Sequence, residues 1–362
     1  MALILTFLGK GGSGCSTVAI ATAKKLASAG SRVLLVSQDS SPVLGHLLGM
    51  SINPSLTEVA SNFKVVGLQS AQLISQGWED IKELEAKYLR SPTLKNVYGQ
   101  ELGVLPGMDE ALALNSLREY EKSGDYDVIL YDGNSAINTL RMFSIPEILS
   151  WYVRRFRQVL TESDVGKTLA PFVKPITSAI LNVSWSADDL ADAPANDILK
   201  AGKAALGDGN RVAAYLVTTA DEMAIAASQY YWGGAQQVGL TVRGIILNQG
   251  GETDSLSTKF DPLTVTSLPQ RTGDNWQPLM DALPQFLGDS QAPKPVTIDV
   301  AARQVKVFLP GFEKKQVKLT QSGPELTIEA GDQRRNIELP PPLAGQSVKG
   351  AKFQNYYLIV SL

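Results

Sequence analysis

A glycine-rich stretch near the start of the chain could bind a phosphate group. Residues 9–16 read G-K-G-G-S-G-C-S and lie between an apolar run and a helical pattern. Glycines let backbone N–H groups turn inward at the positive end of a helix, where they attract an anion. The spacing is that of a phosphate loop, which predicts ATP and Mg2+ as cofactors. The predicted cofactor-binding residues are those of the loop and the helix start: Gly11, Gly12, Ser13, Gly14, Cys15, Ser16 and Thr17.

Three side chains in this stretch decide what the loop can do. Ser16 would offer its hydroxyl to Mg2+. Cys15 stands where a phosphate loop has lysine, and a thiol cannot neutralise the β- and γ-phosphates. Lys10 offers an ammonium from an earlier position. Cys15 would be redox-active if its position at a helix N-terminus lowered its pKa, and a small filler otherwise. Nucleotide binding is predicted, and hydrolysis is left open.

Three further polar residues follow apolar, strand-like runs. Asp39 ends RVLLVSQD, Asp132 ends YDVILYD, and Asn248 follows GIIL. The carboxyl ends of parallel strands meet at one edge of a sheet, where ligands bind, so we expect these residues near the loop. The alternatives are ordinary strand-end residues for the two carboxylates and turn chemistry for Asn248. His46 has no cluster of possible metal ligands beside it and is expected at the surface or in helix packing.

The elements that must position these residues alternate along the chain. Helical patterns separate five short apolar runs, at residues 2–9, 32–39, 126–133, 211–219 and 242–250. Such alternation predicts an α/β fold, a doubly wound, mostly parallel sheet of the P-loop NTPase type.

Two regions of this predicted NTPase domain, residues 1–288, favour helices. Amphipathic stretches at about 60–100 and 140–208 indicate an inserted helical subdomain. Its helices either cover the sheet or present an apolar surface to a hydrophobic partner.

The end of the chain has a different pattern. GDSQAPKPV is rich in turn-forming residues and predicts a linker at residues 289–295. From 296 to 362, apolar residues recur with period two between turns, which predicts a small all-β sandwich.

Composition excludes several classes of protein. With 33 basic and 36 acidic residues the net charge is -3, which gives no argument for a nucleic-acid partner. One cysteine and one histidine exclude internal disulfides and cysteine- or histidine-rich metal sites within a single chain. The apolar runs are too short to span a membrane. The N-terminus resembles a first strand more than a signal peptide, so a cytoplasmic location is expected.

In its ordered motifs the chain resembles the ArsA (arsenite-pump-driving) and tail-anchored-protein targeting ATPase family, over roughly residues 1–285. An early lysine in GKGG marks these deviant phosphate-loop ATPases. RVLLVSQDSS is similar to the family's switch I stretch, VLLxSTDPA, and YDVILYDGNSAINTLR is similar to its YDxxxxDTAPTGHTLR. GIILNQG resembles the family's VVVNQ strand.

The resemblance implies roles for individual residues. Asp39 falls on the aspartate that positions the attacking water, and Lys10 contacts phosphate, often across a dimer interface. Asp132 falls on the carboxylate of switch II and the second shell of Mg2+. Asn248 would read adenine, with Pro269 as a weaker match for an adenine contact. The chain departs from the family at Cys15, at the switch II centre GNSAIN, and in having no CxxC pair.

The last sixty-odd residues resemble the α-crystallin domain of small heat-shock proteins. FLPGFEKKQVKL, ELTIEA, RRNIELP and VKGAKFQNYYLIVSL follow the block order of that domain. Such a domain would be an interaction module or a β cap that stabilises the ATPase domain.

The resemblance to the family and the substituted loop together imply a dimeric, slowly hydrolysing ATPase of the targeting or chaperone type. Its helical subdomain would handle hydrophobic protein clients, with tail-anchored proteins as candidates. The alternative is a non-catalytic chaperone-like binding protein, gated by a nucleotide or without one. A pump-driving ATPase for anions or metalloids is a third, weaker reading, because one cysteine cannot form a thiolate cluster.

Overall fold

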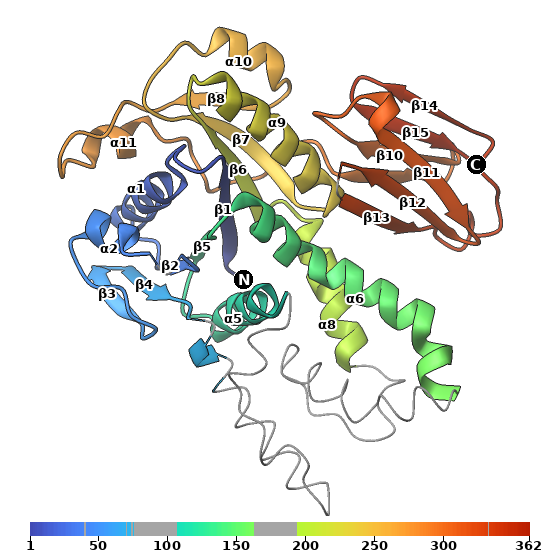
Figure 1. The fold of residues 1–362 in the computed structure, drawn as a ribbon, viewed down its shortest axis with the longest axis horizontal. Coiled ribbons are helices and arrows are strands. Elements are labelled where there is room, and N and C mark those ends of the chain that lie inside the picture. Colours follow the sequence, from blue (N-terminus) through green and yellow to red (C-terminus); the bar gives the residue numbers. More distant parts are fainter. Residues whose placement is uncertain (40, 70, 74, 76–106, 163–193, 332) are drawn as a thin grey trace, which may run out of the picture.

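The computed structural model describes most of the chain. The described residues are 1–39, 41–69, 71–73, 75, 107–162, 194–331 and 333–362. They form a large α/β domain followed by a small all-β domain, as Figure 1 shows. Both parts of the predicted fold class are therefore confirmed.

An eight-stranded sheet organises the α/β domain. Its order is β3-β4-β2-β5-β1-β6-β7-β8, parallel throughout except where β3 pairs with β4. The central strands are buried over their whole length, which explains why they read as continuous apolar runs. The strands are β1 (Leu3–Gly9), β2 (Val33–Ser37), β3 (Thr57–Ala60), β4 (Phe63–Gly67), β5 (Val128–Asp132), β6 (Val212–Thr218), β7 (Thr241–Leu247) and β8 (Thr264–Ser267).

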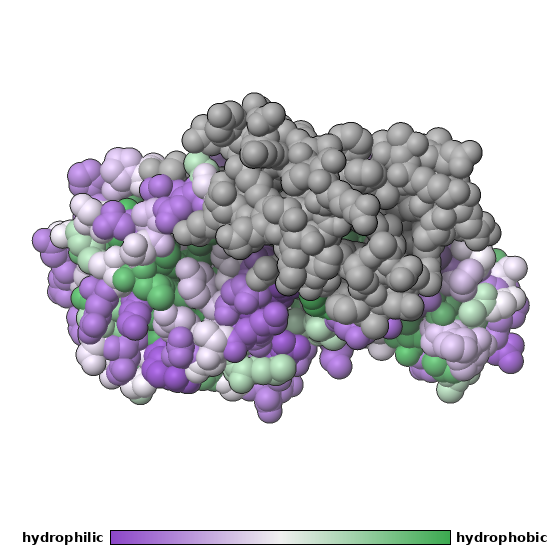
Figure 2. All heavy atoms as spheres, turned by 90° about the horizontal axis from the view of Figure 1, so that it is seen from below, coloured by the Kyte–Doolittle hydropathy of each residue, from purple (hydrophilic) through white to green (hydrophobic). Residues whose placement is uncertain are grey.

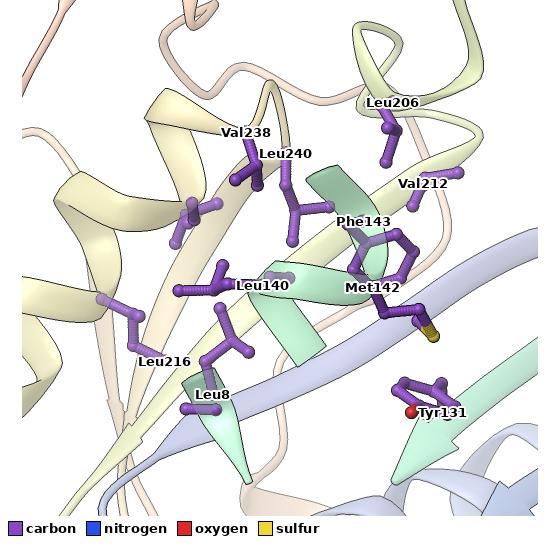
Figure 3. Packing of buried hydrophobic residues seen from close by; sticks show 14 of the residues in the cluster. Leu8, Tyr131, Leu140, Met142, Phe143, Leu206, Val212, Leu216, Val238 and Leu240 are labelled. Carbon is purple, nitrogen blue, oxygen red and sulfur yellow. The ribbon is translucent and has the colours of Figure 1, made fainter. Parts of the chain in front are cut away.

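Helices cover both faces of the sheet. On one face lie α1 (Cys15–Ser28), α2 (Val43–Leu48) and α11 (Gln277–Ala282). On the other lie α5 (Met108–Ser123), α6 (Ala136–Glu162), α8 (Pro194–Leu206), α9 (Glu222–Gln237) and α10 (Asp254–Lys259). Figure 3 shows Leu140 and Phe143 of α6 packed against β1 and β6 through Leu8 and Val212. Strand β1 lies between β5 and β6. Strands β2 to β5 extend the sheet on one side of it, and β6 to β8 extend it on the other.

The predicted helical subdomain needs one correction. Residues 63–67 are strand β4, because Phe63 and Val65 alternate with exposed Lys64 and pair beside β2. Residues 76–106 and 163–193 lie outside the described part of the chain. The described parts of 140–208, α6 and α8, are helical and contact each other.

The C-terminal domain consists of two antiparallel sheets around one core. One sheet has the order β14-β15-β10-β9 and the other β11-β12-β13. Alternate residues of facing strands, such as Val305, Val307 and Ile328, are fully buried between them. The elements are β9 (Val296–Asp299), β10 (Gln304–Phe308), the 3-10 helix η2 (Lys314–Gln316), β11 (Val317–Ser322), β12 (Glu325–Ala330), β13 (Gln333–Glu338), β14 (Gly350–Gln354) and β15 (Tyr357–Ser361). The predicted linker, residues 289–295, stays a prediction.

The two domains pack directly on each other through α9. The Tyr230 and Phe312 rings meet edge to face with centroids 6.2 Å apart, and those of Trp232 and Phe308 are 5.6 Å apart. The guanidinium of Arg335 donates to the backbone oxygen of Gln236 at 2.6 Å. Burial lowers the pKa of Arg335 to about 10.

Hydrophilic and hydrophobic side chains are interspersed over the described surface seen in Figure 2. Among the described helices, none has the length and apolar character that spanning a membrane requires.

Candidate nucleotide site

The predicted site residues lie at one edge of the large sheet. Asp39 follows β2, Asp132 ends β5, Asn248 follows β7, and Pro269 follows β8. The glycine loop leaves the carboxyl end of β1, between β5 and β6. This is the edge at which doubly wound sheets bind ligands, and the crossover at β1 makes it the switch point.

The loop has the geometry of an anion nest. Gly12 and Gly14 have φ values of 88° and 95°, in the left-handed region that favours glycine. The N–H of Ser13 donates to the oxygen of Lys10 at 2.9 Å, which closes the loop on itself. A Cβ on Gly9 would overlap the Ser13 side chain and the backbone oxygen of Val217. The loop thus turns tightly just before the N-terminus of α1, where an anion is favoured.

Asn248 supports the loop from β7. Its Nδ2 donates to the backbone oxygen of Ser13 at 3.0 Å, and the residue is only 4% exposed. A Cβ on Gly14 would overlap this amide, so glycine is required there both by its φ and by the close approach. The turn that follows is tight, since Gln249 has a φ of 71°. This hydrogen bond accounts for Asn248 without an adenine, and the adenine-reading role stays a prediction.

Cys15 is the first residue of α1, at the position of the missing lysine. Its Sγ lies 3.7 Å from Ser13 Oγ and packs against the core on that face of the sheet. Burial raises the pKa of the thiol to about 12, and the charge of Asp132 also raises it. Burial thus opposes the low-pKa interpretation of Cys15, and its redox activity stays a prediction.

Asp132 is the buried charge of the site. It is 2% exposed, and its Oδ2 has no hydrogen-bond partner among the described residues. Burial raises its pKa to about 6, a hydrogen bond with the Ser16 side chain lowers it, and the charge of Asp39 raises it. Ser16, Asp39 and Asp132 are thus close enough to act on one another, as the sequence predicts.

Asp39 is held by a residue that the sequence analysis did not single out. Its Oδ1 accepts from the N–H of Ser41 at 2.8 Å, and its Oδ2 accepts from the Ser41 hydroxyl at 2.7 Å. An aspartate followed two residues later by serine is a common turn, and this spacing could have identified Ser41.

A second missed contact fixes the two strands that carry the carboxylates. The hydroxyl of Tyr131, beside Asp132, donates to Oε1 of Gln38, beside Asp39. Gln38 Nε2 in turn donates to the backbone oxygen of Asp109 in α5 at 3.2 Å. Both side chains are buried, so this chain of hydrogen bonds holds the ends of β2 and β5 together.

The remaining predicted residues are more exposed. Lys10, Gly11 and Gly12 form the exposed tip of the loop, and no atom within 4 Å would meet a Cβ on either glycine. Thr17 is partly buried in the first turn of α1. Pro269 is exposed after β8, beside the end of β7. His46 is exposed on α2, outside the site, as expected.

These residues fit ATP with Mg2+ in most respects. The nest suits a phosphate chain, and a buried carboxylate oxygen without a partner beside a serine hydroxyl suits a hydrated Mg2+. What the described loop lacks is a cation at the position of Cys15.

Comparison with known proteins agrees with the resemblance in the sequence. Residues 2–259 match the family model of the anion-transporting ATPases, and residues 301–362 match an HSP20-like domain found in ArsA proteins. The second match confirms the small heat-shock resemblance of the C-terminal domain.

Individual relatives carry related names. A putative arsenical pump-driving ATPase of Chlorobaculum tepidum is 24% identical over 98% of this chain and 94% of its own length. Protein Rv2184c of Mycobacterium tuberculosis is 27% identical over 80% of this chain and 69% of its own length. An ATPase GET3 of Malassezia globosa is 28% identical over 47% of this chain and 48% of its own length.

Proposed function

The chain belongs to the anion-transporting ATPase family, and on that premise we propose that it binds ATP with Mg2+ and hydrolyses it slowly. The observation that carries the proposal is the nest of residues 11–14 beside Ser16, Asp39 and Asp132 at one edge of the sheet. We propose further that the protein works in the cytoplasm as a homodimer and handles hydrophobic protein clients.

Each residue has a role in this proposal. The backbone N–H groups of the loop bind and orient the phosphates. The hydroxyl of Ser16 and, through water, the carboxylate of Asp132 would hold Mg2+, which neutralises charge on the phosphates. Asp39 orients the attacking water and is itself held in place by both donors of Ser41. Asn248 keeps the loop in shape, and with Pro269 it would border the adenine.

The slow rate follows from the chemistry at Cys15. Phosphoryl transfer depends on positioning and on neutralising charge, and a protonated thiol adds no positive charge. Removal of a single charge-stabilising group typically costs on the order of 10²–10³ in rate. Lys10, at the exposed tip of the loop, is the remaining loop cation and can reach a phosphate bound by its own chain or by a second copy.

The client and partner proposals rest on α6, α8 and the relatives. An ATPase GET3 and an ATPase ASNA1 homolog are among the proteins similar to this chain. Among described large apolar side chains, Ile148 of α6 is 44% exposed and lies within the predicted subdomain.

One observation favours a second candidate, a non-catalytic nucleotide-gated or nucleotide-free binding protein. The contact of Asn248 with Ser13 and the packing of Cys15 stabilise the loop without any ligand. A loop of this kind could be retained as a structural turn.

A third candidate, a pump-driving ATPase, is supported by the anion-transporting ATPase family and by relatives such as the putative arsenical pump-driving ATPase of Chlorobaculum tepidum. The chain's single cysteine cannot form the thiolate cluster that a soft metalloid would favour.

The test measures ATP–Mg2+ binding and steady-state hydrolysis together. Lys10→Ala and Asp39→Asn should abolish hydrolysis, with Asp39→Asn leaving binding intact. Cys15→Lys should raise kcat by on the order of 10²–10³. Cys15→Met should not, because methionine is about as long as lysine but carries no charge. Binding without turnover would favour the nucleotide-gated protein, and no binding at all would favour the nucleotide-free one.

A further inference from the structure

A pocket lies at the opposite edge of the sheet from the nucleotide site. It has a volume of about 330 Å³ and lies between α5, α6, α8 and the first residues of β1 and β6. Its walls are mainly apolar and include Ile4, Leu117, Phe143, Pro146 and Leu199. Figure 3 shows Phe143 beside Leu206 and Val212, two further lining residues. Residues at the amino ends of β1 and β6 cannot reach a ligand at the carboxyl ends, so this pocket is separate.

One wall of the pocket is polar. Asn115, Arg118 and Lys122 follow one another at helical spacing along α5, and Arg211 enters from the start of β6. Two buried atoms on this wall, Oδ1 of Asn115 and Nε of Arg211, have no hydrogen-bond partner among the described residues. Buried polar groups are almost always paired, so these two atoms, on residues that line the same pocket, leave hydrogen-bonding capacity for a polar group of a ligand.

A water molecule alone does not account for the pocket. Water occupies about 30 Å³ in the liquid and needs two to four polar partners, whereas most of the pocket lining is apolar. A volume of about 330 Å³ falls at the lower end of the range for small-molecule sites, which are apolar with a few convergent polar groups. The pocket therefore suits a molecule with an apolar body and one polar end.

The charges favour an anionic end. Arg211 pairs with Glu121 at 3.4 Å, and Arg118 and Lys122 share the carboxylate of Glu119 at 3.0 and 3.4 Å. These five side chains carry three positive and two negative charges. Nε of Arg211 can donate to a carboxylate oxygen, and a rotation of the Asn115 amide exchanges its oxygen for Nδ2, which also donates.

We propose that this pocket binds a monocarboxylate of the fatty-acid class. The carboxylate lies between Arg211 and Asn115, and the alkyl chain extends among Phe143, Leu199 and the small residues of α8. Gly202 and Ala205 keep that wall open, and a Cβ on Gly202 would already lie 3.3 Å from Pro146. The site is independent of ATP and of the proposed function.

The test is calorimetric titration of the full chain, without nucleotide, with decanoate, decan-1-ol and decylamine. These probes share a ten-carbon chain and differ in the polar end. Decanoate should bind saturably and at least 10-fold more tightly than the alcohol, with the amine weakest because the charged side chains around the polar end carry a net positive charge. Ala205→Phe should weaken decanoate binding at least 10-fold by filling the pocket. Ala204→Phe, the same change at the exposed neighbouring residue outside the lining, should leave it unchanged.

Asn115→Leu tests the polar end with little change in volume. It should weaken decanoate about 10-fold and leave decan-1-ol unchanged or tighter, a pattern that general damage to the fold would not produce. No saturable binding of decanoate, or equal weakening by Ala204→Phe and Ala205→Phe, would overturn the proposal. Equal binding of decanoate and decan-1-ol would overturn the carboxylate assignment.

Discussion

Asp132 places a buried carboxylate at the centre of the nucleotide site, and this should cost stability when the site holds no cation. The residue is 2% exposed, and its pKa is raised from 3.8 to about 6, chiefly by burial. A carboxyl whose pKa is raised in the folded state stabilises the fold when it is neutral and destabilises it when it is ionised. The stability it offers is therefore present below about pH 4 and is lost as the pH rises to about 6.

The shift sets the size of the effect. About two pKa units at about 1.4 kcal/mol each give a penalty of about 3 kcal/mol above pH 7. At pH 4.5 Asp132 is protonated in the folded state but mostly ionised in the unfolded chain, so a penalty of about 1 kcal/mol remains. Asp132→Asn keeps the shape and an acceptor for Ser16 but removes the charge. We expect this variant to be more stable than the wild type by about 3 kcal/mol at pH 7.5 and by about 1 kcal/mol at pH 4.5.

The assay is urea unfolding of both proteins at the two pH values, without nucleotide or Mg2+. Groups that do not interact with Asp132 titrate alike in both proteins. The stability difference between the two proteins should therefore change by about 2 kcal/mol between pH 4.5 and 7.5, and this change reports chiefly on Asp132. A difference that is the same at both pH values would refute the buried-charge reasoning. In the presence of ATP and Mg2+ the wild type should gain more stability than Asp132→Asn, if Asp132 holds the cation as proposed.

Three other changes follow from the described contacts. Asn248→Ala should destabilise the ligand-free protein by about 1–3 kcal/mol, because the oxygen of Ser13 loses its donor; an effect seen only with ATP would contradict this. Cys15 should react with iodoacetamide at pH 8 about 10³-fold more slowly than an ordinary exposed cysteine, since only about 10⁻⁴ of it is thiolate; rapid labelling of the native protein would contradict the burial. Phe312→Ala should lower the free energy of unfolding by about 3–5 kcal/mol, whereas loss of about 0.5 kcal/mol or less would mean that the domain contact is weak.

The sequence was sufficient to predict the elements that repeat a simple pattern. Runs such as RVLLVSQD and YDVILYD are buried on both faces, and a glycine loop between strand and helix fixes its own geometry. The order of these motifs along the chain brought Asp39, Asp132 and Ser16 to one edge, because parallel strands all end there. The two C-terminal sheets followed from alternation with period two in the same way.

The rest depended on contacts between residues far apart in the sequence. The pKa of Cys15 was open because a helix N-terminus lowers it and burial raises it, and only the fold shows that burial is the larger effect. The contact of Asn248 with Ser13 spans 235 residues and has no local signal. Strand β4 was missed because its apolar run is short and is interrupted by exposed Lys64. Such a run resembles an amphipathic helix as much as a strand.

The C-terminal domain has contacts with both helices that start at the nucleotide site. Helix α6 begins four residues beyond Asp132, and Trp151 within it donates to Glu325 of β12 at 3.0 Å. Helix α9 begins just after β6, and its Gly233 lets Phe312 approach so closely that a Cβ would overlap the ring. A module tied only by a linker would have none of these contacts. The packing therefore favours a domain that stabilises α6 and α9 over one that moves independently, and any rearrangement of the loop after Asp132 has to be accommodated at this interface.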